Sequence, residues 1–148
     1  MVFRFRKRRR AAGPDTELRV AYGRWAEDVG FAIVGSVDNH FARQPLGAVS
    51  FAAIARGDGP EILGYFWFSD QEAAAGYVTR RACDPDGYNA GAVWNEYLNR
   101  GYLGGEAPSQ TYGSLIDENF GHRIGRIDSG SLRRIESLAE LRELAALP

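Results

Sequence analysis

Two histidines and one cysteine are the side chains of this 148-residue chain best suited to acid–base or nucleophilic chemistry near neutral pH. His122 follows Glu118 by four residues, and on a helix that spacing places the two side chains on one face. There the carboxylate would orient the imidazole, and the imidazole would act as a general acid or base. His40 lies in a predicted loop and Cys83 ends a predicted helix, so the fold would have to bring either of them to His122. One interpretation is therefore a small enzyme that uses Glu118 and His122.

Metal and nucleotide sites have spacing patterns that this sequence does not contain. The histidines form no HExxH or HxH pattern, and a single cysteine forms neither a CxxC pair nor an internal disulfide. The glycine-rich stretches GDG, GYLGG and FGHRIG match neither GxGxxG nor GxxxxGK(S/T). A lone cysteine is also more often a small buried hydrophobic residue than a nucleophile. We therefore expect no metal site and no cofactor.

The segment from residue 84 to residue 118 combines acidic side chains with tyrosines. It contains six carboxylates and one arginine, which leaves a net charge of −5. Three of its tyrosines adjoin a glycine in predicted loops, which puts rigid amphipathic side chains on adaptable backbone, as in many protein-binding surfaces. The sequence therefore predicts a partner-binding surface made of Asp84, Asp86, Tyr88, Tyr102, Glu106 and Tyr112. The alternative is a solvated acidic face whose tyrosines are partly buried.

The basic residues are unevenly distributed along the chain. Six of the eighteen lie in the first ten residues: Arg4, Arg6, Lys7, Arg8, Arg9 and Arg10. From residue 11 onward, 12 basic side chains oppose 19 acidic ones, a net charge of −7. A nucleic-acid-binding domain needs clustered Lys and Arg on its folded surface, so we expect this acidic folded part of the chain to bind no nucleic acid. Because opposite charges attract, we expect its partner to be a cationic protein. The tail suits anionic surfaces, and a third interpretation is an adaptor that the tail recruits to anionic membrane or nucleic acid.

Length and composition are those of one ordinary globular domain. Hydrophobic residues make up 45% of the chain and charged residues 25%, which argues against wholesale disorder. The stretch AAGPD has the composition of a linker, so we predict a disordered basic tail at 1–13 and a single domain at 14–148. The basic run is followed by the polar AAGPDTELRV, and no run approaches the roughly 20 apolar residues that span a bilayer. We therefore expect a cytoplasmic protein without a transmembrane segment.

Hydrophobic periodicity predicts a helix and three strands in the first half of the domain. Apolar residues recur on one helical face across 16–29, and extended runs follow at 31–37, 45–56 and 61–69. The turn signal GDGP between the last two runs predicts that they pair as an antiparallel hairpin. Within the run YFWF, side chains alternate between two faces, which indicates a central strand packed on both sides.

Capping signals and periodicity predict mainly helices in the second half. Ser69 with Glu72 forms a capping box, which predicts a helix over 70–83. Further predicted elements are a helix at 91–102, a helical turn at 115–120, a hairpin of RIGRID with SLRRI around Ser129-Gly130, and a last helix at 138–147 capped by Ser137. We expect an α+β fold: a single domain with an antiparallel three- to five-stranded sheet and helices packed mainly on one face.

The predicted elements follow one another as a helix, a three-strand meander and then helices that end in YLNRGYLGG. This order resembles that of the immunity proteins of bacterial polymorphic-toxin and specialised secretion systems, over about residues 16–105. The resemblance implies inhibition by covering a toxin, with no catalysis and no cofactor. We therefore expect a small non-catalytic binding protein that occludes a cationic toxin or other partner through its acidic, tyrosine-rich surface.

Overall fold

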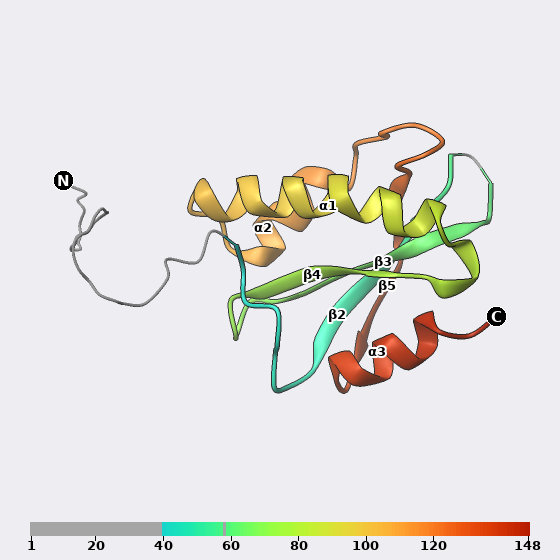
Figure 1. The fold of residues 1–148 in the computed structure, drawn as a ribbon. Helices are drawn as coiled ribbons and strands as arrows, with labels where there is room; N and C mark the ends of the chain where they lie inside the picture. Colours follow the sequence, from blue (N-terminus) through green and yellow to red (C-terminus); the bar gives the residue numbers. More distant parts are fainter. Residues whose placement is uncertain (1–39, 58) are drawn as a thin grey trace, which may run out of the picture. The chain divides into compact units, whose positions relative to one another are not determined.

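The computed structural model describes residues 40–57 and 59–148, which form an antiparallel sheet and three α-helices (Figure 1). The strands are β2 (Val49–Ala55), β3 (Ile62–Ser69), β4 (Ala74–Thr79) and β5 (Arg126–Ile135), in the spatial order β4-β3-β2-β5. The helices are α1 (Asp86–Leu103), α2 (Pro108–Leu115) and α3 (Leu138–Ala145), with a short 3-10 helix at Arg81–Cys83. The predicted tail at 1–13, helix at 16–29 and strand at 31–37 lie outside the described residues.

The predicted hairpin of the second and third extended runs is confirmed. β2 and β3 pair antiparallel, with Ala52 opposite Phe66 and Phe51 opposite Trp67. β3 is an interior strand between β2 and β4, and its side chains alternate as the run YFWF indicated. Phe66 lies in the core on one face of the sheet, whereas Tyr65 and Trp67 lie in the core on the other face. The strand is therefore packed on both sides.

The two faces of the sheet are covered unequally. α1 and α2 lie on one face, and the short α3 lies on the other (Figure 1). The expected fold class, an antiparallel sheet with helices mainly on one face, is confirmed for the described part of the chain. β2, β3 and β4 pair antiparallel in chain order and are joined by short connections, whereas β5 pairs antiparallel with β2 only after the chain has passed through α1 and α2.

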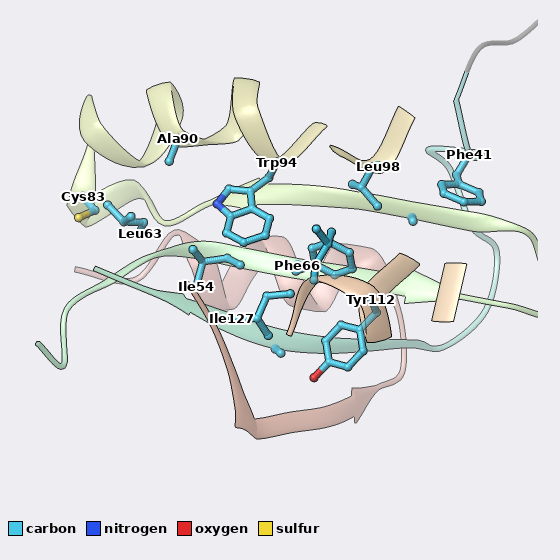
Figure 2. Close-up of a cluster of buried hydrophobic side chains, with 13 residues drawn as sticks. Phe41, Ile54, Leu63, Phe66, Cys83, Ala90, Trp94, Leu98, Tyr112 and Ile127 are labelled. Carbon is cyan, nitrogen blue, oxygen red and sulfur yellow. The ribbon is translucent and has the colours of Figure 1, made fainter. Parts of the chain in front are cut away.

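The larger core lies between α1, α2 and the sheet, and it extends along the whole of α1 (Figure 2). Trp94 and Leu98 project from α1 onto Phe66 in the middle of this core, and Phe41 closes it near the end of the helix. Trp94 is fully buried, and its indole N–H donates a hydrogen bond of 2.8 Å to the carbonyl of Ile124. This core fixes the buried face of α1, so the opposite face is presented to solvent in one orientation.

The predicted helix over 70–83 is wrong, because residues 74–79 form the edge strand β4. Glu72 does not cap a helix of its own. Its carboxylate accepts hydrogen bonds of 2.8 Å from the backbone N–H groups of both Leu46 and Gly47. Ala73 adopts a positive φ of 49°, which turns the chain back so that β4 can pair along β3. Long-range pairing thus overrides the helix preference of the alanine-rich stretch.

Glu72 should make the fold sensitive to acid, because the two N–H donors lower the pKa of its carboxyl group. A carboxyl whose pKa is lowered in the folded state stabilises the fold above its unfolded pKa, and that contribution is lost as pH falls through the folded pKa. We expect the urea midpoint of the wild-type chain to fall more between neutral and acidic pH than that of Glu72→Gln. The exposed Glu136 provides the control. If Glu72→Gln and Glu136→Gln lose stability equally on acidification, the expectation is wrong.

Three other elements differ from the sequence prediction. α1 begins at Asp86 rather than at residue 91, and α2 ends at Leu115, where a helical turn was predicted to start. The predicted hairpin around Ser129-Gly130 is wrong, because β5 runs as one strand beside β2. The register shifts between Phe51 and Ala53, so the β5 residues around Gly130 form a bulge instead of a turn. Within this bulge, the Ser131 hydroxyl accepts a hydrogen bond of 2.8 Å from the Ala53 N–H. The last helix is confirmed, with the Ser137 hydroxyl accepting from the backbone N–H of Glu140.

Candidate protein-binding surface

Helix α1 carries or borders five of the six residues predicted to bind a partner. Asp84 precedes the helix, Asp86 and Tyr88 lie in its first turn, Tyr102 lies in its last turn, and Glu106 follows it. Placing the tyrosines in loops was wrong, because Tyr88 and Tyr102 are helical. Fourteen residues separate these two tyrosines, about 21 Å along a helix. The predicted surface is therefore two groups at opposite ends of one rigid helix.

The group at the start of α1 presents a tyrosine beside carboxylates. Tyr88 is 72% exposed, and Asp84 is also exposed. Asp86 accepts a hydrogen bond of 2.9 Å from the Arg56 guanidinium, which also bonds Glu61 at 2.8 Å. These bonds, above all the one that Arg56 donates to Asp86, raise the pKa of Arg56. Arg56 compensates the charge of Asp86, so Asp84 is the acidic residue of this group without such a partner in the described ranges.

The group at the end of α1 is more apolar than the sequence suggested. Tyr102 is 36% exposed and packs edge-on against Phe41, with 5.3 Å between the ring centroids. The neighbouring Leu103 is 68% exposed. Glu106 accepts a hydrogen bond of 2.7 Å from the Thr111 hydroxyl and so helps to join α1 to α2. The sequence patterns did not predict that Leu103 lies on the surface, because helical periodicity alone does not show where the buried face of α1 ends.

Tyr112 belongs to the core and not to the binding surface. Tyr112 is 8% exposed, and its ring centroid lies 5.7 Å from that of Phe66 (Figure 2). The ring of Phe68 is closer still, at a centroid distance of 4.9 Å. Burial raises the pKa of its hydroxyl group, which has no hydrogen-bond partner among the described residues. The sequence placed Tyr112 in a loop, whereas it lies in α2, whose inner face packs on β3. We therefore remove it from the predicted surface.

The residues of the enzyme interpretation do not share a helical face. α2 ends at Leu115, and Glu118 and His122 lie in the exposed turns that follow it. His40 lies 2.7 Å from the carbonyl of its neighbour Phe41, measured from Nδ1. Within residues 40–57 and 59–148, no group of three or more His, Cys, Asp and Glu side chains is placed to hold a metal ion. The helical pairing of Glu118 with His122 is therefore wrong, and a catalytic role for either residue stays an untested prediction.

A groove that the sequence did not reveal runs beside the edge strand β4. It has a volume of about 420 Å³ and is bordered by Arg43, Arg81 and Arg142, which lie far apart in the sequence. A second groove of about 430 Å³ lies between the start of β3 and the end of α3, and its apolar lining includes Ile62, Tyr65, Leu144 and Leu147. The first groove was missed because its floor, β4, was predicted as a helix.

Comparison of the chain with known protein families, with curated proteins and with solved structures found no match. None of the helices in the described ranges is long and apolar enough to cross a membrane. The resemblance to immunity proteins and the expected cytoplasmic location thus stay predictions.

Cys83 should react slowly with thiol reagents in the folded protein. Its side chain is buried, and burial raises the pKa of the thiol, so little of the reactive thiolate is present at neutral pH. Its hydrogen-bond partners are Arg56 and Glu61, each 3.5 Å from the sulfur. We expect a chromogenic disulfide reagent at neutral pH to label Cys83 at the rate of unfolding and to label it at once in denaturant. Rapid labelling of the folded chain would instead favour a catalytic thiol.

Proposed function

We propose that this protein is a small non-catalytic binding protein of the immunity type. It covers a cationic partner protein with the exposed side of α1, which includes Tyr88 and is bordered by Asp84. The observation that carries the proposal is Tyr88, a large side chain that is 72% exposed although it lies on a helix rather than in a loop. Exposed tyrosines on rigid backbone are common anchors of protein interfaces, because they bury a large area with few rotatable bonds.

The rigidity of α1 supports this proposal. The buried face of the helix includes Ala90, Trp94 and Leu98, which are packed into the larger core along its length (Figure 2). A partner that contacts the opposite face meets a surface that is already ordered. The entropic cost of binding is then limited to a few side chains, which favours affinity.

The carboxylates near the start of α1 supply charge for a cationic partner. Asp84 is exposed, while the charge of Asp86 is compensated by Arg56. Glu96 on the same helix is similarly paired with Arg100 at 3.3 Å. Because exposed charges at the rim of an interface act mainly on the rate of encounter, we assign most of the affinity to Tyr88 and the steering to Asp84.

The test is the binding kinetics of the partner recovered from the native host, measured by surface plasmon resonance at two ionic strengths. Tyr88→Ala should raise the dissociation rate by about 30-fold, which corresponds to about 2 kcal/mol. Asp84→Lys should lower the association rate and weaken its dependence on salt.

The control is Leu132→Ala, which truncates another exposed side chain, on β5. It should bind like the wild-type chain. If Tyr88→Ala and Asp84→Lys also bind like the wild type, the partner docks elsewhere and the α1 surface is only a solvated face.

A further inference from the structure

In the part of the chain that the structure describes, the outer edge of β4 has no strand partner beyond its first two residues. Ala42 pairs with the start of the strand: its N–H donates to Ala73 at 3.0 Å, and its carbonyl accepts from Ala75 at 3.1 Å. The N–H of Ala75 therefore points away from β3. The register between β3 and β4 is unbroken from Ala74 to Thr79, so the main chain alternates and the N–H groups of Tyr77 and Thr79 point the same way. Among the described residues, no strand pairs with this part of β4.

The side chains around this open edge leave room for another chain. The groove of about 420 Å³ is lined by the four consecutive β4 residues 76–79 and by two small residues at the end of α3, Ala145 and Ala146. The ring of Trp67 lies over Gly76, where an added Cβ would come within 2.7 Å of a ring atom. The ring of Tyr77 is turned toward α1, because its hydroxyl donates to the carbonyl of Gly87 at 2.8 Å.

The groove is lined by positive charge. Arg43, Arg81 and Arg142 border it, and its lining contains no carboxylate. None of these three arginines forms an ion pair with a described residue, although Arg43 donates a hydrogen bond of 3.5 Å to the side chain of Asn99. The chain from residue 11 onward carries a net negative charge, so a groove bordered by three arginines and no carboxylate has the opposite sign to the chain around it.

We propose that the open edge of β4, from Gly76 to Thr79, is a docking site for an extended acidic segment of a partner protein. The segment adds to the sheet beside β4, and its carboxylates pair with Arg43, Arg81 and Arg142. Main-chain hydrogen bonds to Tyr77 and Thr79 supply affinity, as in other cases of strand addition, and the guanidinium groups select for acidic side chains. This site lies apart from the exposed side of α1 and binds a segment of the opposite charge.

A second copy of this chain is a poorer occupant of the same edge. Two copies paired through β4 would bring two sets of three arginines together, and like charges across an interface oppose association. An acidic strand instead neutralises the groove. Because side chains on a strand alternate between two faces, a segment with a carboxylate at every second position places its charges on one side.

The experiment measures binding of a short fluorescent peptide that alternates valine with aspartate to the full chain by fluorescence anisotropy. Amide chemical shifts map the site. We expect binding to shift the amide signals of 76–79. Arg81→Glu combined with Arg142→Glu should weaken binding by about tenfold or more, since both charge-assisted contacts become repulsive. Arg133→Glu on β5 changes charge outside the groove and should leave the affinity nearly unchanged. The basic tail is the same in every variant, and the amide signals of 76–79 separate binding in the groove from any binding of the acidic peptide to the tail.

Two further measurements separate strand addition from simple anion binding. Thr79→Pro removes an outward N–H that no described strand uses, so the variant should fold, as circular dichroism would show, and should no longer bind the peptide. An acidic peptide methylated on its backbone nitrogens should also fail to bind.

Several outcomes would overturn the proposal. It is wrong if the peptide leaves the signals of 76–79 unchanged, or if the Arg81→Glu, Arg142→Glu chain binds it as tightly as Arg133→Glu does. It is also wrong if the methylated peptide or a valine–lysine peptide binds as tightly as the acidic one. Light scattering that shows dimers of the full chain, abolished by Thr79→Pro, would assign the edge to a second copy instead.

Discussion

Replacing Trp94 by alanine should lower the free energy of unfolding by about 3–5 kcal/mol, the usual cost of deleting a large buried aromatic side chain. The indole ring is fully buried and packs edge-on against Phe66, with 6.3 Å between the ring centroids (Figure 2). It also packs edge-on against Phe120, at a centroid distance of 5.2 Å. Its loss also leaves the carbonyl of Ile124 without the indole N–H. Urea denaturation followed by circular dichroism measures the change.

The control for this prediction is Trp94→Phe, which keeps an aromatic ring and removes the N–H donor. We expect it to cost less than Trp94→Ala, because it retains part of the buried area and loses mainly one hydrogen bond. If Trp94→Ala unfolds at nearly the same urea concentration as the wild-type chain, α1 is not held to the sheet by this side chain and the core is described wrongly.

Replacing Gly87 by alanine should destabilise the protein by about 1–3 kcal/mol, although alanine is the better helix former. Gly87 lies in the first turn of α1, where the helix approaches the start of β3 closely. An added Cβ would collide with the carbonyl oxygen of Leu63, which is backbone and cannot rotate away. Helix propensity alone favours alanine by up to about 1 kcal/mol, so propensity and packing predict opposite signs.

Gly113 provides the matched control for the sign of this change in stability. It lies in α2, and an added Cβ there would meet no atom within 4 Å. Gly113→Ala should therefore stabilise the protein by about 0.5–1 kcal/mol, because only the propensity acts. Thermal unfolding of both variants measures the difference. A rise in melting temperature for Gly87→Ala comparable to that for Gly113→Ala would show that α1 does not approach β3 as closely as the structure has it.

Several elements could be predicted correctly because strong local signals specify them. The turn GDGP lies between two apolar runs, and those runs pair as β2 and β3. The alternation in YFWF correctly separated Phe66 from Tyr65 and Trp67. Ser137 caps α3 through the N–H of Glu140, three residues on. In each case the interactions that select the structure lie within a few residues of one another, or follow from the two-residue period of a strand.

Part of the binding surface was also accessible to sequence reasoning. Tyr88 and Asp84 were selected for their residue types in an acidic segment, and both are exposed. The same reasoning included Tyr112, which is a core residue, and Asp86, whose charge is compensated by Arg56. Sequence composition gives the number of charges and rings. It does not give the long-range partners that bury or neutralise them.

β4, the continuous β5 and the arginine-lined groove depend on contacts between distant residues and could not be predicted from local patterns. A capping signal and the three alanines at 73–75 predict a helix here, but this local preference amounts to less than about 1 kcal/mol per residue, and Gly76, Val78 and Thr79 are weak helix formers. Pairing with β3 and packing of Trp67 over Gly76 outweigh it. Arg43, Arg81 and Arg142 meet only because that edge strand forms between them. Where the local preference of the sequence for a helix, strand or turn is strong, it determines the element. Where that preference is weak, contacts between residues far apart in the sequence determine it.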